Sequence, residues 1–232
     1  MSTVVERPPR SSHRAAPVLP AVAGDYFLLT GMSWSFYEHL LAELGNRQIR
    51  VTYHRGALEL MSPSYRHERG GGLLGWFVSI ILEETGRPSV CGGSTTMRRQ
   101  DVECGLEPDD CFWIENFSAV LGRREIDLTI DPAPDLSIEV DVASSSIDRL
   151  AVYAALRVPE VWRFDGLMIR VYRLNERGEY DVLDHSPTFP FLPLDKLIEF
   201  IERSVEIDDM TLRREFREWL RTEILPNLSE LQ

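Results

Sequence analysis

Hydrophobic and polar side chains alternate along residues 136–142, as they do on a β-strand with two different faces. The apolar face carries Leu136, Ile138, Val140 and Val142, and the polar face carries Ser137, Glu139 and Asp141. On a strand, residues two positions apart lie roughly 6 to 7 Å apart along one face. The pattern therefore predicts a strand that holds two neighbouring carboxylates, Glu139 and Asp141.

The pattern changes to a helical period directly after this strand. Ser145 or Ser146 can cap a helix in which an apolar stripe recurs at the i, i+3, i+4, i+7 spacing, and the stripe consists of Ile147, Leu150, Ala151 and Ala154. Arg149 and Tyr153 lie four residues apart on another face. Pro159 ends the helix, and residues 160–164 begin a new extended run. The region predicts a strand, a helix and a second strand, with polar groups near the end of the first.

The rest of the chain alternates short extended runs with amphipathic helices. Helices are predicted from a capping box at Ser35 and Glu38 to Gly45, and over residues 67–84, 194–201 and 211–225. Extended runs flank Arg55-Gly56 and follow at residues 89–97, 109–114, 169–174 and 180–183. These elements indicate the α/β class, with a mixed sheet flanked by helices and a C-terminal helical extension.

Composition limits the possible functions. The chain has 232 residues, a formal net charge of −12, and 25 Lys and Arg residues, of which only Lys196 is a lysine. Such a charge opposes broad binding to a phosphate backbone, so a nucleic acid would need a local basic surface. No apolar run approaches the length of a membrane span or resembles a secretory signal, which predicts a cytoplasmic protein without a membrane partner. Three cysteines without Cys-x-x-Cys spacing predict free thiols.

Three segments divide the chain by composition. Residues 1–22 are rich in Pro, Ser, Arg and Ala without periodicity and are predicted to be a disordered leader. Residues 23–205 carry the predicted sheet and its helices. Residues 206–232 are predicted to form the helical extension.

The two carboxylates allow competing interpretations. They are close enough to share one divalent cation, which would relieve their repulsion, but an exposed strand face with a surface arginine at position 149 has the same pattern. Glu59, between two leucines, could likewise lie on a solvated strand face. The run Gly70-Gly71-Gly72 lacks the ending of a phosphate-binding loop, which favours close helix packing. Ser144–Ser146 lack the Gly-x-Ser-x-Gly turn of a serine hydrolase.

Several short motifs, in this order and spacing, resemble the Uma2 family of putative restriction endonucleases over roughly residues 30–205. They are Gly56–Pro63 with His67-Glu68, Glu107-Pro108-Asp109, Pro134–Asp141, and Tyr153–Leu156 with Val158–Trp162. The resemblance implies the PD-(D/E)xK nuclease fold, which is a restriction-endonuclease-like mixed sheet flanked by helices. It also implies metal-dependent cleavage of nucleic acid, with DNA as the expected partner, and it allows a homodimer.

The resemblance assigns roles to particular residues. It makes Asp109 and Glu139 the acids of the site, and it matches Glu59 and His67 to upstream polar positions. Asp109, Glu139 and Asp141 are expected to hold Mg²⁺ or Mn²⁺. Asp141 occupies the position where the wider fold often has lysine, so the catalytic cation is expected at Arg149, which is a poor proton shuttle. The alternative is a catalytically weak or inactive nuclease-fold protein that serves as a binding or regulatory module.

Overall fold

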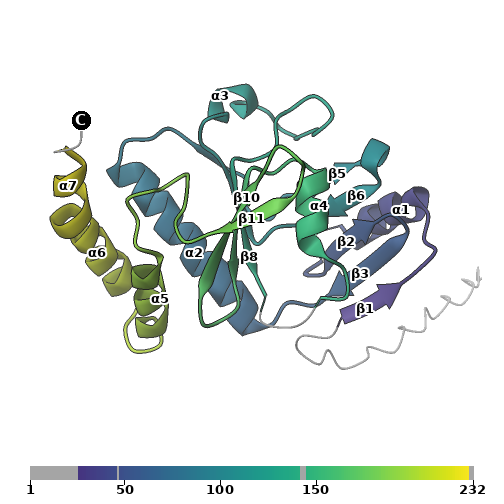
Figure 1. The fold of residues 1–232 in the computed structure, drawn as a ribbon. Coiled ribbons are helices and arrows are strands. Elements are labelled where there is room, and N and C mark those ends of the chain that lie inside the picture. The colour runs from purple at the N-terminus through teal and green to yellow at the C-terminus, as the bar shows by residue number, and fades with distance from the viewer. Residues whose placement is uncertain (1–25, 46, 142–144, 230–232) are drawn as a thin grey trace, which may run out of the picture.

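Two β-sheets with helices around them make up the computed structural model, which describes residues 26–45, 47–141 and 145–229 (Figure 1). The first sheet is antiparallel throughout, in the order β1-β3-β2-β6-β5. Its strands are β1 (Tyr26–Leu29), β2 (Arg50–His54), β3 (Ala57–Met61), β5 (Met97–Arg99) and β6 (Cys104–Leu106). The hairpin predicted around Arg55-Gly56 is confirmed as β2 and β3.

The second sheet has the order β11-β10-β9-β8-β7-β4. Its strands are β4 (Val90–Cys91), β7 (Asp110–Trp113), β8 (Leu136–Val140), β9 (Glu160–Phe164), β10 (Ile169–Leu174) and β11 (Tyr180–Leu183). β8 and β9 run parallel, and the other neighbours in this sheet are antiparallel. The sheet is therefore mixed, as the sequence predicts, although the sequence does not foresee the separation into two sheets.

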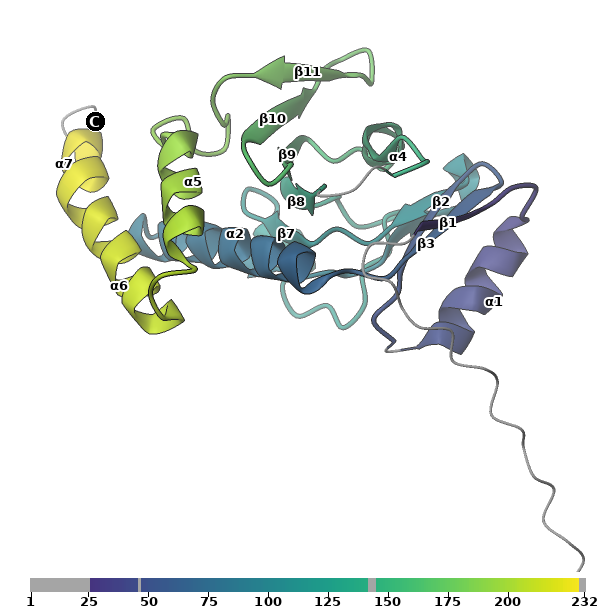
Figure 2. The ribbon, with the colours of Figure 1, turned by 90° about the horizontal axis from the view of Figure 1, so that it is seen from below.

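Helices cover both sheets. They are α1 (Trp34–Leu44), α2 (Tyr65–Glu84), η1 (Gln100–Val102), α3 (Phe117–Val120), α4 (Arg149–Ala155), α5 (Leu194–Arg203), α6 (Asp209–Trp219), the π-helical turn η2 (Leu220–Ile224) and α7 (Leu225–Ser229). α1 and α4 lie on opposite sides of the first sheet, while α2 crosses the second sheet and packs against α5 and α6 (Figure 2). None of the helices in the described ranges is long and apolar enough to cross a membrane. The predicted leader, Val142 and Ser144 lie outside the described residues.

The predicted strand–helix–strand unit is confirmed as β8, α4 and β9, but two details of α4 differ from the prediction. Asp148 caps the helix by accepting from the backbone N–H groups of Leu150 and Ala151, so neither Ser145 nor Ser146 is its cap. Val152 and Tyr153, which the predicted stripe does not include, are the fully buried side chains of α4, whereas of the predicted stripe Ile147 is buried and Leu150 packs against the same core. Because α4 lies between the two sheets, the face with Arg149 and Tyr153 points inward. At α1, similarly, Ser33 is the cap instead of Ser35.

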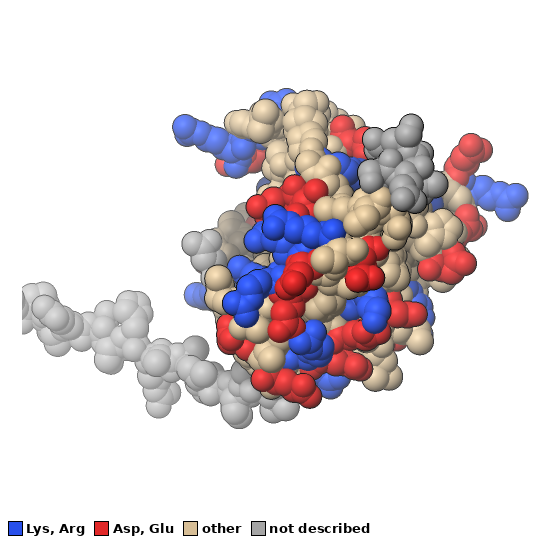
Figure 3. Space-filling view, turned by 90° about the vertical axis from the view of Figure 1, so that its left-hand side faces the viewer, with Lys and Arg blue, Asp and Glu red and all other residues tan. Residues whose placement is uncertain are grey.

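The C-terminal helices share the main hydrophobic core with α2. Phe216 of α6 packs with its ring centroid 4.4 Å from that of Phe77 in α2 and 5.1 Å from that of Phe200 in α5. Arg217 and Arg221 form ion pairs with Glu83 and Glu84 of α2. Acidic and basic side chains alternate over this side of the molecule, so it presents no continuous basic stripe (Figure 3).

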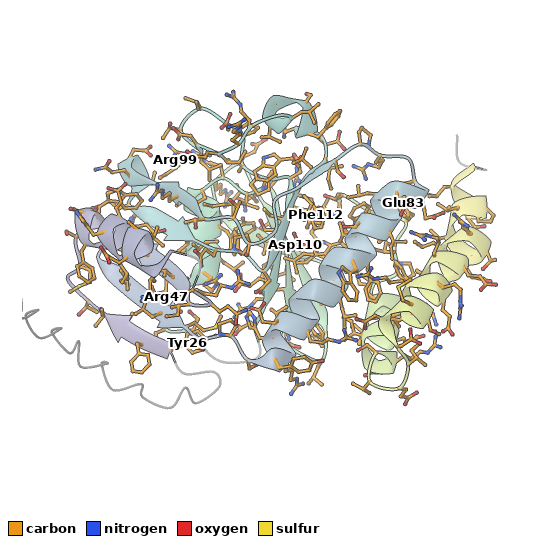
Figure 4. The ribbon with its side chains drawn as sticks, turned by 180° about the vertical axis from the view of Figure 1, so that it is seen from behind. Tyr26, Arg47, Glu83, Arg99, Asp110 and Phe112 are labelled. Carbon is orange, nitrogen blue, oxygen red and sulfur yellow. The ribbon has the colours of Figure 1, made fainter. Side chains whose placement is uncertain are left out.

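The glycine run in α2 allows close packing, as the sequence predicts. A Cβ added at Gly70 would lie 3.4 Å from Val140, and one added at Gly71 would lie 2.9 Å from the Cβ of Asp109. A Cβ at Gly72 would meet nothing within 4 Å. α2 thus approaches β8 and the start of β7 on one side only, where Asp110 also faces the helix (Figure 4).

We expect Gly71→Ala to lower the free energy of unfolding by about 1 to 3 kcal/mol, because the new methyl group overpacks against Asp109. Gly72→Ala is the matched control, since it adds the same group in the same helix to open space and should gain up to about 1 kcal/mol from helix propensity. Urea unfolding of both variants measures the difference. Equal effects at the two positions would contradict this packing.

Candidate active site

Asp109 lies at the junction of β7, β8 and α2. Its backbone N–H donates to Ile138 at 3.0 Å, and its Oδ2 accepts from the backbone N–H of Val140 at 2.7 Å. Asp110 pairs with Ile138 in the antiparallel register, so the next position places Asp109 beside Glu139. Only 6 % of the Asp109 side chain is exposed. The two acids from separate sequence motifs are therefore neighbours on adjacent strands.

His67 and Glu68, in the first turn of α2, complete a group of possible metal ligands with Asp109. Ser64 caps this helix and accepts from the backbone N–H of His67. One ligand atom from each of the three residues lies within 4.8 Å of the others. His67 Nδ1 is buried, faces Asp109 Oδ1 at 3.4 Å, and has no hydrogen-bond partner. One imidazole nitrogen and two carboxylates are a donor set that suits Mn²⁺ and, with more water, Mg²⁺.

The electrostatics of Asp109 and His67 follow from their burial. Burial, followed by the charge of Glu139, raises the pKa of Asp109 to about 8. Burial lowers the pKa of His67, and Glu139 opposes that shift. His67 is therefore neutral at pH 7, with a ring lone pair available to a cation. A bound divalent ion would favour the ionised form of Asp109 and reverse the shift of its pKa.

Arg50 of β2 is a further cation at this group. Its guanidinium lies 3.7 Å from Asp109 Oδ1 and 3.2 Å from Glu68, and it also donates to the carbonyl of Pro108. Arg50 thus neutralises part of the negative charge on the side of Asp109 that faces the first sheet.

Glu139 is held by two residues of α4. Its Oε1 lies 2.5 Å from Arg149 Nε, and its Oε2 accepts from Arg149 Nη2 at 2.9 Å and from the Tyr153 hydroxyl at 2.7 Å. The carboxylate is nearly buried. The exposed strand face that the sequence allowed is therefore excluded, because each residue of β8 is buried.

Arg149 connects the two sheets. Besides Glu139 of β8, its guanidinium donates to Thr52 Oγ1 of β2 at 2.5 Å and to the carbonyl of Glu107, which follows β6, at 2.9 Å. Each of its three nitrogens contacts a protein oxygen, and only 14 % of the side chain is exposed. The surface arginine that the sequence allowed is likewise excluded. In this arrangement Arg149 fixes Glu139 rather than reaching toward solvent.

Asp141 and Glu59 contact other partners. Asp141 forms an ion pair with Arg163 of β9. Glu59 is buried, which excludes a solvated strand face, and its two oxygens accept from Ser145 Oγ and Ser146 N at 2.6 Å each. Glu59 therefore positions the start of the segment that leads into α4.

A cavity of about 270 Å³ opens beside these residues. Its lining includes Glu139, Asp141, Ser145, Arg149, Tyr153 and Arg163. Asp109 and His67 do not line it, so Glu139 lies between the possible metal ligands and the cavity.

The structure thus brings together only part of the predicted site. Asp109 and His67 form one group beside Glu139, which Arg149 holds. Asp141 lines the cavity beside Glu139 but pairs with Arg163, and Glu59 binds the segment before α4. Glu68, Arg50 and Arg163 join the site without having been predicted as its residues. Glu68 follows His67 in the quoted motif and could have been included, but no local signal distinguishes Arg50 or Arg163 from the other arginines.

Comparison with known proteins supports the resemblance. A sequence model of the Uma2 family, described as "Putative restriction endonuclease", matches residues 34–206. The chain therefore belongs to the Uma2 family. Among solved structures, it is similar to a putative nuclease belonging to DUF820 from Anabaena variabilis ATCC 29413, with 20 % identity and a TM-score of 0.46 over 65 % of this chain and 90 % of that chain. No curated protein matches it.

Proposed function

We propose that this protein is an endonuclease that hydrolyses phosphodiester bonds of nucleic acid, DNA in the first place, with a bound Mg²⁺ or Mn²⁺. The observation that carries the proposal is the group of Asp109, His67 and Glu68 beside Glu139, in which the side chains of Asp109 and His67 are buried and that of Glu68 is exposed. The Nδ1 atom of His67, which has no hydrogen-bond partner, lies 3.4 Å from the Asp109 carboxyl group, which Arg50 approaches only to 3.7 Å. Membership in a family of this description supports the same chemistry.

Asp109, His67 and Glu68 would hold the cation. When bound, a divalent ion polarises the phosphate and lowers the pKa of an attacking water. Glu139, fixed by Arg149 and Tyr153, faces the cavity and can accept a proton from a water there. Glu139 and Asp141 could serve as ligands, as the sequence predicts, only if Arg149 and Arg163 moved away from them. Arg149 acts in this proposal as a positioning residue.

A second candidate is the binding or regulatory module without catalytic activity. The observation that favours it is that arginines already neutralise two of the three predicted metal ligands, Glu139 by Arg149 and Asp141 by Arg163. Such pairs would hold the fold without a metal.

Cleavage assays on single- and double-stranded DNA and RNA, in Mg²⁺, Mn²⁺ and EDTA, separate the two candidates. We expect activity that requires the metal and falls on the order of 10²-fold or more in Asp109→Asn, because the cation contributes several kcal/mol of transition-state stabilisation. Asp110→Asn is the matched control, since it makes the same change one residue away at a carboxylate that contacts Cys91 and the backbone of Cys111.

A thermal melt provides a readout independent of activity. Mn²⁺ should raise the melting temperature of the wild type and of Asp110→Asn, but not that of Asp109→Asn, because a ligand that binds only the native state stabilises it. Cleavage in EDTA, or equal activity in both variants, would refute the assigned site. No cleavage with any metal would favour the binding module.

A further inference from the structure

We infer that Arg163 binds a phosphate group of the nucleic acid in the cavity beside Glu139, and that Asp141 occupies its guanidinium when no phosphate is bound. This inference rests on the proposed nucleic acid substrate, and it assigns the part of the site that recognises the phosphate backbone. A protein with a net charge of −12 needs such a local cation to approach a polyanion.

The position of Arg163 follows from the sheet. Arg163 of β9 pairs with Glu139 of β8 in the parallel register, and its side chain lines the same cavity as Glu139. A phosphate held by Arg163 would therefore lie next to the proposed catalytic carboxylate. An arginine guanidinium suits this task because it can donate two parallel hydrogen bonds to phosphate oxygens.

Arg149, the other arginine lining this cavity, is not available for the same task. Its three nitrogens contact Glu139, Thr52 and the carbonyl of Glu107, and 14 % of its side chain is exposed. Arg163 is 35 % exposed, and the partner of its guanidinium is Asp141, which is itself 16 % exposed. A partly exposed ion pair has a small net stability, so a phosphate can replace the carboxylate without large cost.

Arg170 provides a matched control. It lies directly opposite Arg163 on β10, and it also forms an ion pair with an aspartate, Asp165. Its side chain is 43 % exposed, and it does not line the cavity. The two arginines therefore share residue type, sheet and kind of partner, and they differ in access to the site.

The test measures binding of short labelled single- and double-stranded DNA and RNA oligonucleotides by fluorescence anisotropy, in EDTA and in Mn²⁺, over a series of salt concentrations. We expect Arg163→Gln to weaken binding about tenfold and to reduce the salt dependence by about one phosphate contact. Arg163→Lys should keep the salt dependence, and Arg170→Gln should change neither quantity. Asp141→Asn should strengthen binding severalfold, and adding Arg163→Gln to it should abolish the gain.

The outcomes separate this inference from the proposed function. If the wild type binds an oligonucleotide and Arg163→Gln weakens that binding while Arg170→Gln does not, the inference stands, even if no variant cleaves. If both glutamine variants bind like the wild type, or if the wild type binds none of the oligonucleotides under either condition, the inference is overturned. Circular dichroism and melting temperatures establish that each variant is folded, and if Arg163→Gln unfolds, Arg163→Met replaces it, because methionine also removes the charge and keeps an unbranched apolar side chain.

Discussion

Replacing Glu139 by alanine will destabilise the metal-free protein by about 3 to 5 kcal/mol, because it leaves the guanidinium of Arg149 nearly buried without its counterion. The same change also removes the acceptor of the Tyr153 hydroxyl, which is fully buried. The loss is measured by urea unfolding in EDTA. The sequence alone favours a gain in stability from this change, since deleting one of two neighbouring carboxylates would relieve their repulsion.

Two further variants make this result specific to the buried pair. Arg170→Ala breaks the more exposed ion pair with Asp165 and should cost no more than about 1 kcal/mol. Combining Glu139→Ala with Arg149→Leu removes both charges and should recover part of the loss, because apolar groups of similar volume can replace a buried ion pair. A Glu139→Ala protein as stable as the wild type in EDTA would show that Arg149 is not held as the structure describes.

The stability of the metal-free protein will fall as the pH rises from about 4 to about 8, and Asp109→Asn will remove much of that fall. The pKa of Asp109 is raised from an ordinary 3.8 to about 8 in the folded protein. Between these values the folded state holds a proton that the unfolded state has lost, so the unfolded state becomes more favourable as the pH increases. A shift of one pKa unit changes the free energy of unfolding by about 1.4 kcal/mol. The raised pKa of Asp109 therefore has a large effect on the stability at pH 8.

Unfolding experiments in EDTA from pH 4 to 9 measure this dependence. The amide oxygen that Asp109→Asn introduces can still accept the hydrogen bond from Val140 N, so the variant should be more stable than the wild type at pH 8 and similar to it near pH 4. At pH 8, Mn²⁺ should make the wild type more stable than Asp109→Asn, because the ion binds the ionised carboxylate of the wild type. Identical pH profiles for the two proteins would contradict the raised pKa.

Local patterns predicted much of the secondary structure, and the family resemblance pointed to two acids of the candidate site. The period-two alternation around Glu139 predicts β8, and the acid after Pro108 directly precedes β7. Periodicity assigns residues to faces, but it does not tell which elements meet. The contact between His67 and Asp109 depends on how α2 crosses the sheet, which Gly71 permits and which no local signal specifies.

The ion-pair partners of the charged residues also could not be predicted from the sequence. α4 has seven residues, and because it lies between two sheets it buries Val152 and Tyr153 in addition to the predicted face, of which Ile147 and Leu150 reach the core. That position turns Arg149 inward to Glu139. The pairing of Asp141 with Arg163 likewise depends on the parallel register of β8 and β9. That register brings together residues that lie before and after α4 in the sequence.

The packing of Phe216 against Phe77 and Phe200 has a consequence for shortened versions of the chain. The family match ends at residue 206, before α6 begins at Asp209. A protein cut there would expose the aromatic surface of α2 and α5 to water, together with the part of the core that Leu212 and Leu220 fill. Such a fragment should aggregate or be degraded during expression. Studies of the candidate site therefore need the chain through η2, although no residue of α6 or η2 lies in that site.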